Sequence, residues 1–172
     1  MRRLLVALLV AVPGIVAVGA GTDTTPGVVE ALPPGFTEVT VTSSLSSLTA
    51  VEALPDGRMV ALEKNGGVMV LDERSGSLRT AEAIDFAVCT SSERGLLGFT
   101  HDPNFTSSGF VYVYRTISSG EPGGCHNRVS RFTMAGDVID AASEVVLVDR
   151  ISSVNGNHNA GDLEVGNDGF LY

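Results

Sequence analysis

One of the three histidines lies in a polar loop near the end of the chain, and a histidine side chain can transfer protons. His158 lies in the segment 157–161 (NHNAG), and an apolar pattern resumes at Leu163. An imidazole with an unperturbed pKa of about 6.5 can accept a proton near neutral pH. From the residues alone such a histidine is more often a solvated turn residue, so the loop offers His158 as a candidate general base and no more.

A second polar loop lies about 65 residues earlier and also leads into an apolar strand. It comprises residues 93–99 (ERGLLGF), which 101–105 (HDPNF) and 109–113 (GFVYV) follow. Polar clusters in loops between packed strands are common places for binding and catalytic sites. The fold would have to bring both loops to one face for them to act together.

The elements available to position these loops are strands. Short runs alternate β-branched or apolar residues with polar ones, turn residues separate them, and no stretch shows a helical period. The 20 glycines and the absence of tryptophan agree with turn-rich β structure. We expect an all-β chain with strands at 37–42, 58–63, 68–71, 110–116, 128–133 and 144–148.

A long repeat underlies these strands. Turns ending at Gly57, Gly109 and Gly169 each precede an apolar strand, and they are 52 and 60 residues apart. A four-stranded antiparallel sheet with its loops takes about 40–50 residues, so this period favours the blades of a β-propeller. The rival is a β-sandwich, whose turn signals recur without such a long period. In a propeller the polar loops of successive blades meet at one face.

The N-terminus predicts export. Residues 1–20 combine two arginines, an apolar run and small residues at the end, which is the pattern of a secretory signal peptide. The apolar run of about 15 residues is shorter than the roughly 20 that span a bilayer, so we expect no membrane insertion after cleavage. Residues 21–34 would form a Pro/Gly/Thr-rich leader and 35–172 the domain, in a secreted or periplasmic protein.

The net charge and the cysteines indicate which ligands and which covalent bonds to expect. Removal of residues 1–20 takes away two arginines and moves the formal charge from −9 to −11, which argues against binding to nucleic acid or anionic lipid. Cys89 and Cys125 are the two cysteines, and an exported protein is expected to pair them in a structural disulfide. No acidic run resembles a calcium loop, so we predict no metal site within this chain.

The last residues, 169–172 (GFLY), read as the opening of a strand. A strand without its neighbours leaves an unpaired edge. We therefore expect the chain to be part of a longer protein and to hold two to three blades.

Several motifs together resemble the glucose/sorbosone dehydrogenase family of soluble aldose dehydrogenases, which depend on pyrroloquinoline quinone (PQQ). They are ERGLLG, HDPNF and GFVYVY at 93–114, NRVSRFT and GDVID at 127–140, and the segment from His158 to Tyr172. The resemblance covers residues 32–172. It implies a six-bladed β-propeller, with PQQ and calcium held at one face, of which this chain would be the N-terminal part.

The resemblance also implies roles for three residues. His158 falls at the family's general base, which removes the proton of the sugar C1 hydroxyl while C1 loses a hydride to the quinone. Glu93 and Asn157 fall at positions near the cofactor, although the family often has Gln and Asp there. The calcium ligands and most groups that grip PQQ would lie after residue 172. The implied substrate is an aldose, oxidised to a lactone, and the later electron acceptor stays open.

Two other functions remain possible at this point. The same domain family includes the ectodomain of the hedgehog-interacting protein, so a non-catalytic extracellular binding propeller is the main alternative. A hydrolytic propeller of the lactonase type would need a central metal with several acidic ligands, which the sequence does not show.

Overall fold

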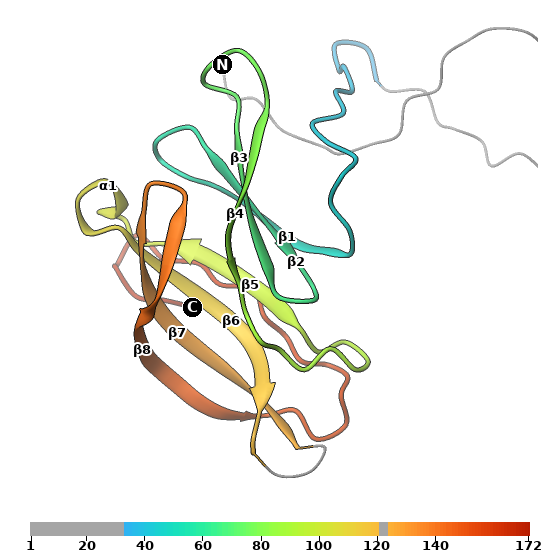
Figure 1. Ribbon diagram of the computed structural model, residues 1–172, viewed down its shortest axis with the longest axis vertical. Helices are drawn as coiled ribbons and strands as arrows, with labels where there is room; N and C mark the ends of the chain where they lie inside the picture. The colour runs from blue at the N-terminus through green and yellow to red at the C-terminus, as the bar shows by residue number, and fades with distance from the viewer. Residues whose placement is uncertain (1–32, 121–123) are drawn as a thin grey trace, which may run out of the picture. The chain divides into compact units, whose positions relative to one another are not determined.

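The computed structural model describes residues 33–120 and 124–172 (Figure 1). The chain divides into two units, 1–44 and 45–172. The predicted signal peptide and most of the predicted leader lie outside the described residues. The strand predicted at 37–42 is wrong, because these residues form no strand. An alternating pattern gives a strand only where a neighbouring strand accepts its hydrogen bonds.

The first sheet of unit 45–172 is a four-stranded antiparallel meander. Its strands follow the chain order β1-β2-β3-β4, with β2 and β3 buried over most of their length. Gly57 and Gly66 lie in the tight turns before and after β2, at φ of 89° and 122°. Such backbone conformations favour glycine. The strands are β1 (Leu48–Ala53), β2 (Met59–Glu63), β3 (Gly67–Asp72) and β4 (Arg79–Asp85).

The second sheet repeats this plan in the order β5-β6-β7-β8. A four-residue helix, α1 (Phe105–Ser108), joins β5 to β6 and ends at Gly109, which adopts the left-handed conformation at φ 64°. Among the described residues no helix is long and apolar enough to cross a membrane. The strands are β5 (Leu96–His101), β6 (Phe110–Ser118), β7 (Cys125–Ala135) and β8 (Val138–Ser152).

The other five predicted strands are confirmed, and each falls within β2, β3, β6, β7 or β8 apart from one residue at the start of the first. Three strands were missed. Of these, β1 (LTAVEA) and β4 (RTAEAID) are largely exposed edge strands with little apolar contrast. The third, β5, contains Gly98, which disfavours a strand by composition.

A hydrophobic core fills the space between the two sheets. The inward residues of β2 and β3 meet those of β5, β6 and β7, and the Phe86 ring packs on Phe132 with 5.0 Å between centroids. Burying such side chains contributes roughly 1.5–3 kcal/mol each. The largest members are Leu54, Leu62, Phe86, Leu96, Phe99, Phe105, Phe132, Met134 and Ile139.

The opposite face of the second sheet is covered as well. Leu163 packs on Tyr114 and Val129, and Leu171 joins this smaller core through a bridge between Val165 and Leu171. Residues 162–172 therefore form a short turn segment, closed by one bridge, that covers this face. A sheet packed on both faces is the arrangement of a propeller blade and differs from a two-layer sandwich.

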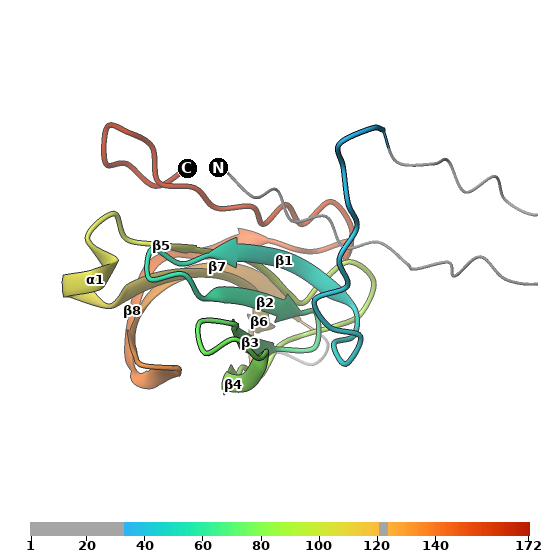
Figure 2. The same ribbon diagram turned by 90° about the horizontal axis from the view of Figure 1, so that it is seen from above.

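The two sheets lie side by side with their strands in the same order. The first strands of the two sheets, β1 and β5, contact each other, and so do the last strands, β4 and β8. In Figure 2, β1 and β5 lie on the side of the C-terminal segment, and β4 lies on the opposite side. The repeat of turn glycines is explained in part, because Gly57 and Gly109 each lie between the first and second strands of a sheet, and Gly169 lies in the turn between the bridged residues Val165 and Leu171.

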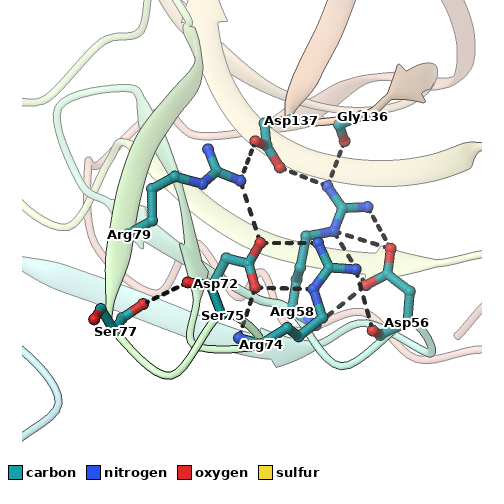
Figure 3. Close-up of polar contacts among 9 residues, drawn as sticks. All are labelled: Asp56, Arg58, Asp72, Arg74, Ser75, Ser77, Arg79, Gly136 and Asp137. Carbon is teal, nitrogen blue, oxygen red and sulfur yellow. Dashed lines mark hydrogen bonds and ion pairs between the residues drawn. The ribbon is translucent and has the colours of Figure 1, made fainter.

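A cluster of charged residues joins the sheets at one end (Figure 3). Arg58, only 5% exposed, donates to Asp56 and to Asp137 in the β7–β8 turn, at 2.6 and 2.8 Å. Arg79 pairs with both Asp72 and Asp137. The cluster therefore fixes the hairpin of the second sheet against the turns of the first.

Candidate functional site

The two polar loops singled out in the sequence lie next to each other. One connects β4 to β5 and carries Glu93; the other follows β8 and carries His158. The backbone N–H of His158 donates to Glu93 Oε2 at 2.5 Å, and the N–H of Glu93 donates to the carbonyl of Gly156 at 2.9 Å. The first loop connects the last strand of one sheet to the first strand of the next, and the second loop follows β8, the last strand of the second sheet, so the two loops hold equivalent places after successive sheets.

Arg94 reinforces this contact between the loops. Its guanidinium donates from Nε to Ser153 Oγ at 2.9 Å, from Nη2 to the carbonyls of Ser153 and Val154, and from Nη1 to Ser91 Oγ at 2.8 Å. The fixed fork of donors suits several acceptors at once. Arg94 therefore holds the loop of His158 against its own loop.

The His158 side chain itself is exposed and makes no hydrogen bond with a described residue, so its imidazole is available to a ligand. Its backbone is in the left-handed region at φ 56°, and so is that of Ala160 at φ 57°. Asn157 is also exposed, and its side chain has no partner among the described residues. The structure thus brings Glu93 and His158 into contact and leaves Asn157 beside them.

A buried polar group beneath the loop was missed by the sequence analysis. Asn159 is 4% exposed and bonds to Asn127 of β7 and to Ser153. The signal was present, because both asparagines lie within the motifs quoted above. What the motifs do not reveal is that these side chains point inward.

The predicted disulfide is confirmed. Cys89, in the loop of Glu93, is bonded to Cys125 at the start of β7. The Cys89 N–H also donates to the carbonyl of Thr116, and the Thr116 hydroxyl donates to Asn127 Oδ1 at 2.6 Å. The bond therefore joins the loop that contacts His158 to the strand that contacts Asn159.

The glycines of the ERGLLG segment allow close backbone approach. A Cβ at Gly98 would lie 1.7 Å from the carbonyl oxygen of Gly161, and one at Gly95 would lie 2.4 Å from that of Lys64. Neither position has space for a side chain. The segment after His158 can therefore pack directly on β5.

Two cations lie near these loops, and neither forms an ion pair with a carboxylate of the described residues. Lys64 Nζ donates to the carbonyls of Thr90 and Ser92 at 2.9 and 2.6 Å, and Arg94 donates to the acceptors given above. Their charges are therefore not neutralised by an ion pair. Within the described residues no group of His, Cys, Asp and Glu is arranged to hold a metal ion.

A pocket of about 560 Å³ lies at the other end of β5. Its lining includes Glu52, His101 and Glu164, and burial raises the pKa of Glu52. Glu93 and His158 do not line it. We therefore assign the candidate site to the two loops and not to this pocket.

The comparison with protein families agrees with this geometry. The family profile described as "Glucose / Sorbosone dehydrogenase" matches residues 45–172, which contain both sheets and both loops.

The chain belongs to the glucose/sorbosone dehydrogenase family.

Solved structures support the same fold. An oxidoreductase of Thermus thermophilus described as a glucose dehydrogenase is 30% identical, with a TM-score of 0.63 over 76% of this chain and 38% of that one. The PQQ-bound aldose sugar dehydrogenase of Streptomyces coelicolor is 26% identical, with a TM-score of 0.61 over 77% of this chain and 39% of that one.

A third structure, the apo-form aldose sugar dehydrogenase of Escherichia coli, is 20% identical with a TM-score of 0.59, over 70% of this chain and 35% of that one, and shows the fold alone. This family member thus spans about two fifths of the first two structures. The predicted fold class, an all-β chain with the first two to three blades of a dehydrogenase propeller, is confirmed.

The residues of this chain fit one part of a site for an anionic quinone. His158 offers an exposed proton acceptor, and Lys64 and Arg94 add positive charge nearby. Both cationic head groups already donate to backbone carbonyls, and the Glu93 carboxylate is bonded to the His158 N–H. The described residues therefore present an exposed imidazole, but they do not by themselves form a cradle for the carboxylates of PQQ.

Proposed function

We propose that this chain supplies the general-base loop of a PQQ-dependent aldose dehydrogenase, which oxidises an aldose at C1 to a lactone. The observation that supports this most directly is the contact between the loops of Glu93 and His158 in a member of the glucose/sorbosone dehydrogenase family. It presents an exposed imidazole from a loop that is fixed at its backbone. A base must be held in place in this way to be effective.

The proton transfer is assigned to His158. A neutral imidazole nitrogen accepts the proton of the C1 hydroxyl, C1 loses its hydrogen with an electron pair, and the C1–O bond becomes a carbonyl. When bound, PQQ supplies the two-electron acceptor that no protein side chain provides. Deprotonation raises the electron density at the sugar oxygen and so favours loss of the hydride.

We assign two further residues to the surroundings of the cofactor. Asn157 is exposed beside His158, and its amide, which has no partner among the described residues, can be offered to a bound ligand. Glu93 holds the His158 N–H, so in this proposal it acts on the loop and lies near the cofactor without gripping it. Calcium, and most of the groups that hold the PQQ carboxylates, would come from residues after 172.

We also propose that the protein is secreted or periplasmic. Residues 1–20 have the pattern of a signal peptide, and a structural disulfide is typical of oxidising compartments. The N-terminal sequence of the exported protein tests this, and we expect it to begin at Gly21.

The experiment uses the protein expressed from its complete gene, incubated with PQQ and calcium, with dye reduction measured over a panel of aldoses. We expect His158→Ala to lower kcat by about 10²–10⁴-fold, the usual contribution of a general base. The control is His126→Ala, because His126 pairs with Asp149 on the second sheet. Unchanged turnover in His158→Ala would refute the assignment. Absence of dye reduction with every aldose would favour the binding propeller instead.

A further inference from the structure

We infer that Asn159 is the positioning residue that fixes the orientation of His158. The inference rests on the proposed role of His158 as base, but the placement of the loop can be measured independently. The observation is a contrast between neighbours. The His158 side chain is exposed and has no partner among the described residues, whereas the next residue, Asn159, is 4% exposed and uses its side chain and its carbonyl for hydrogen bonds.

Four partners surround Asn159. Its Oδ1 accepts from Ser153 Oγ at 2.5 Å and from Asn127 Nδ2 at 3.2 Å, and its Nδ2 donates to the carbonyl of Gly156 at 2.9 Å. Its backbone carbonyl accepts from the hydroxyl of Tyr114 at 2.6 Å. These partners come from β6, β7, the residue after β8 and the loop itself. One side chain thus joins the loop to the rigid part of the second sheet.

The bonds require an amide of this length. The site uses an acceptor and a donor on the same planar group, and asparagine supplies both. Aspartate would place a second oxygen against the Gly156 carbonyl, where Nδ2 now donates. Alanine would leave Ser153 Oγ and Asn127 Nδ2 without this acceptor in a buried region.

The backbone conformation on either side of Asn159 explains why its hydrogen bonds, here called the Asn159 anchor, determine the orientation of His158. Both neighbours of Asn159, His158 and Ala160, adopt left-handed backbone conformations, which carry strain in residues other than glycine. Such conformations persist where the surroundings hold them. With Asn159 fixed, the N–H of His158 points to Glu93 and its side chain points to solvent. Without the anchor, both residues can relax.

The test is residue-resolved amide hydrogen exchange on the protein expressed from its complete gene. We expect Asn159→Ala to speed exchange of the His158 amide at least about tenfold, with unchanged exchange at Val111 and Val113 in the core. Asn155→Ala is the matched control, because Asn155 is exposed in the same loop and has no partner among the described residues. Unchanged exchange at His158 would overturn the inference. Equal acceleration throughout the core would also overturn it, by showing a general structural role.

Asn159→Asp carries the same measurement if Asn159→Ala does not fold, since aspartate keeps the volume and the Oδ1 acceptor but loses the donor to the Gly156 carbonyl. In the active protein, Asn159→Ala should lower kcat more than it raises KM, because a displaced base impairs the transition state more than substrate binding. A loss confined to KM would contradict positioning of the base. If His158→Ala left turnover intact, the proposed function would be refuted. The exchange experiment would still show whether the Asn159 side chain holds the His158 loop in place.

Discussion

Polar side chains buried in β6 and β7 are satisfied by the loop that carries His158. Burial raises the pKa of Tyr114, although a hydrogen bond with Asn127 opposes the shift, so the phenol stays protonated at neutral pH and can donate. Its acceptor, the carbonyl of Asn159, belongs to a loop without a regular strand partner at that point. Single side-chain hydrogen bonds of this kind satisfy the backbone of the loop, as hydrogen bonds to a neighbouring strand satisfy the backbone of a strand.

Tyr114→Phe should therefore lower the free energy of unfolding by about 1 kcal/mol, because the buried carbonyl of Asn159 loses its shorter hydrogen bond and keeps only the 3.4 Å bond from Asn127 Nδ2. The matched control is Tyr172→Phe, whose hydroxyl donates to Asp168 at an exposed position. We expect that change to stay within about 0.5 kcal/mol. Urea unfolding followed by far-ultraviolet circular dichroism measures both. Equal effects of the two substitutions would show that burial of the Tyr114 bond does not matter.

At the scale of strands, the spacing between neighbouring sheets depends on glycine. Gly98 lies in β5 and Gly161 lies in the segment after His158, and the backbones are too close for any Cβ at position 98. This contact sets how near the segment 161–172 can come to the second sheet. The small core of Tyr114, Val129 and Leu163 closes over the same face.

Gly98→Ala should destabilise the protein by about 1–3 kcal/mol, the range for overpacking a filled space. Gly67→Ala is the control, because Gly67 also lies in a strand and its new methyl group would meet the end of the Glu63 side chain, which can move away. Thermal unfolding of both variants makes the comparison. A Gly98→Ala protein as stable as Gly67→Ala would mean that the two backbones can separate without cost.

At the scale of unit 45–172, the charged cluster of Figure 3 links the two sheets away from the candidate site. Hydrogen bonding from Arg58 lowers the pKa of Asp56. For Asp137 burial acts in the opposite direction, but the bonds from Arg79 and Arg58 outweigh it and lower its pKa as well. Carboxyl groups with lowered pKa values in the folded protein stabilise it above their ordinary pKa near 4, and this contribution is lost as the pH falls.

Acid should therefore lower the melting temperature between about pH 5 and pH 3. Arg58→Met should lower the melting temperature at pH 7 and make it fall less as the pH is lowered, because the carboxylates of Asp56 and Asp137 lose their ion pairs with Arg58. Arg150→Met is the control, because the Arg150 side chain is exposed and has no ion-pair partner among the described residues. Scanning fluorimetry over this pH range is the measurement. Parallel curves for wild type and Arg58→Met would contradict the linkage.

The sequence predicted the parts of the fold that local patterns encode. The turn glycines, the apolar strands and the pair Cys89–Cys125 were all recognised, because turns, alternation and cysteine pairing have local or compositional signatures. The pattern at 37–42 misled, since alternation does not reveal whether a neighbouring strand is present. Asn159 was overlooked because its burial arises from β6 and β7, far away in the chain.

The Cys89–Cys125 bond ties down the two supports of the His158 loop, one through the segment with Glu93 and Arg94 and the other through Asn127. Recombinant material made in a reducing cytoplasm would have free thiols at these positions. Its polypeptide could be pure and full-length and yet hold the loop loosely. Production in the bacterial periplasm, or oxidative refolding checked by thiol titration, is therefore the sound starting point for any assay of this protein.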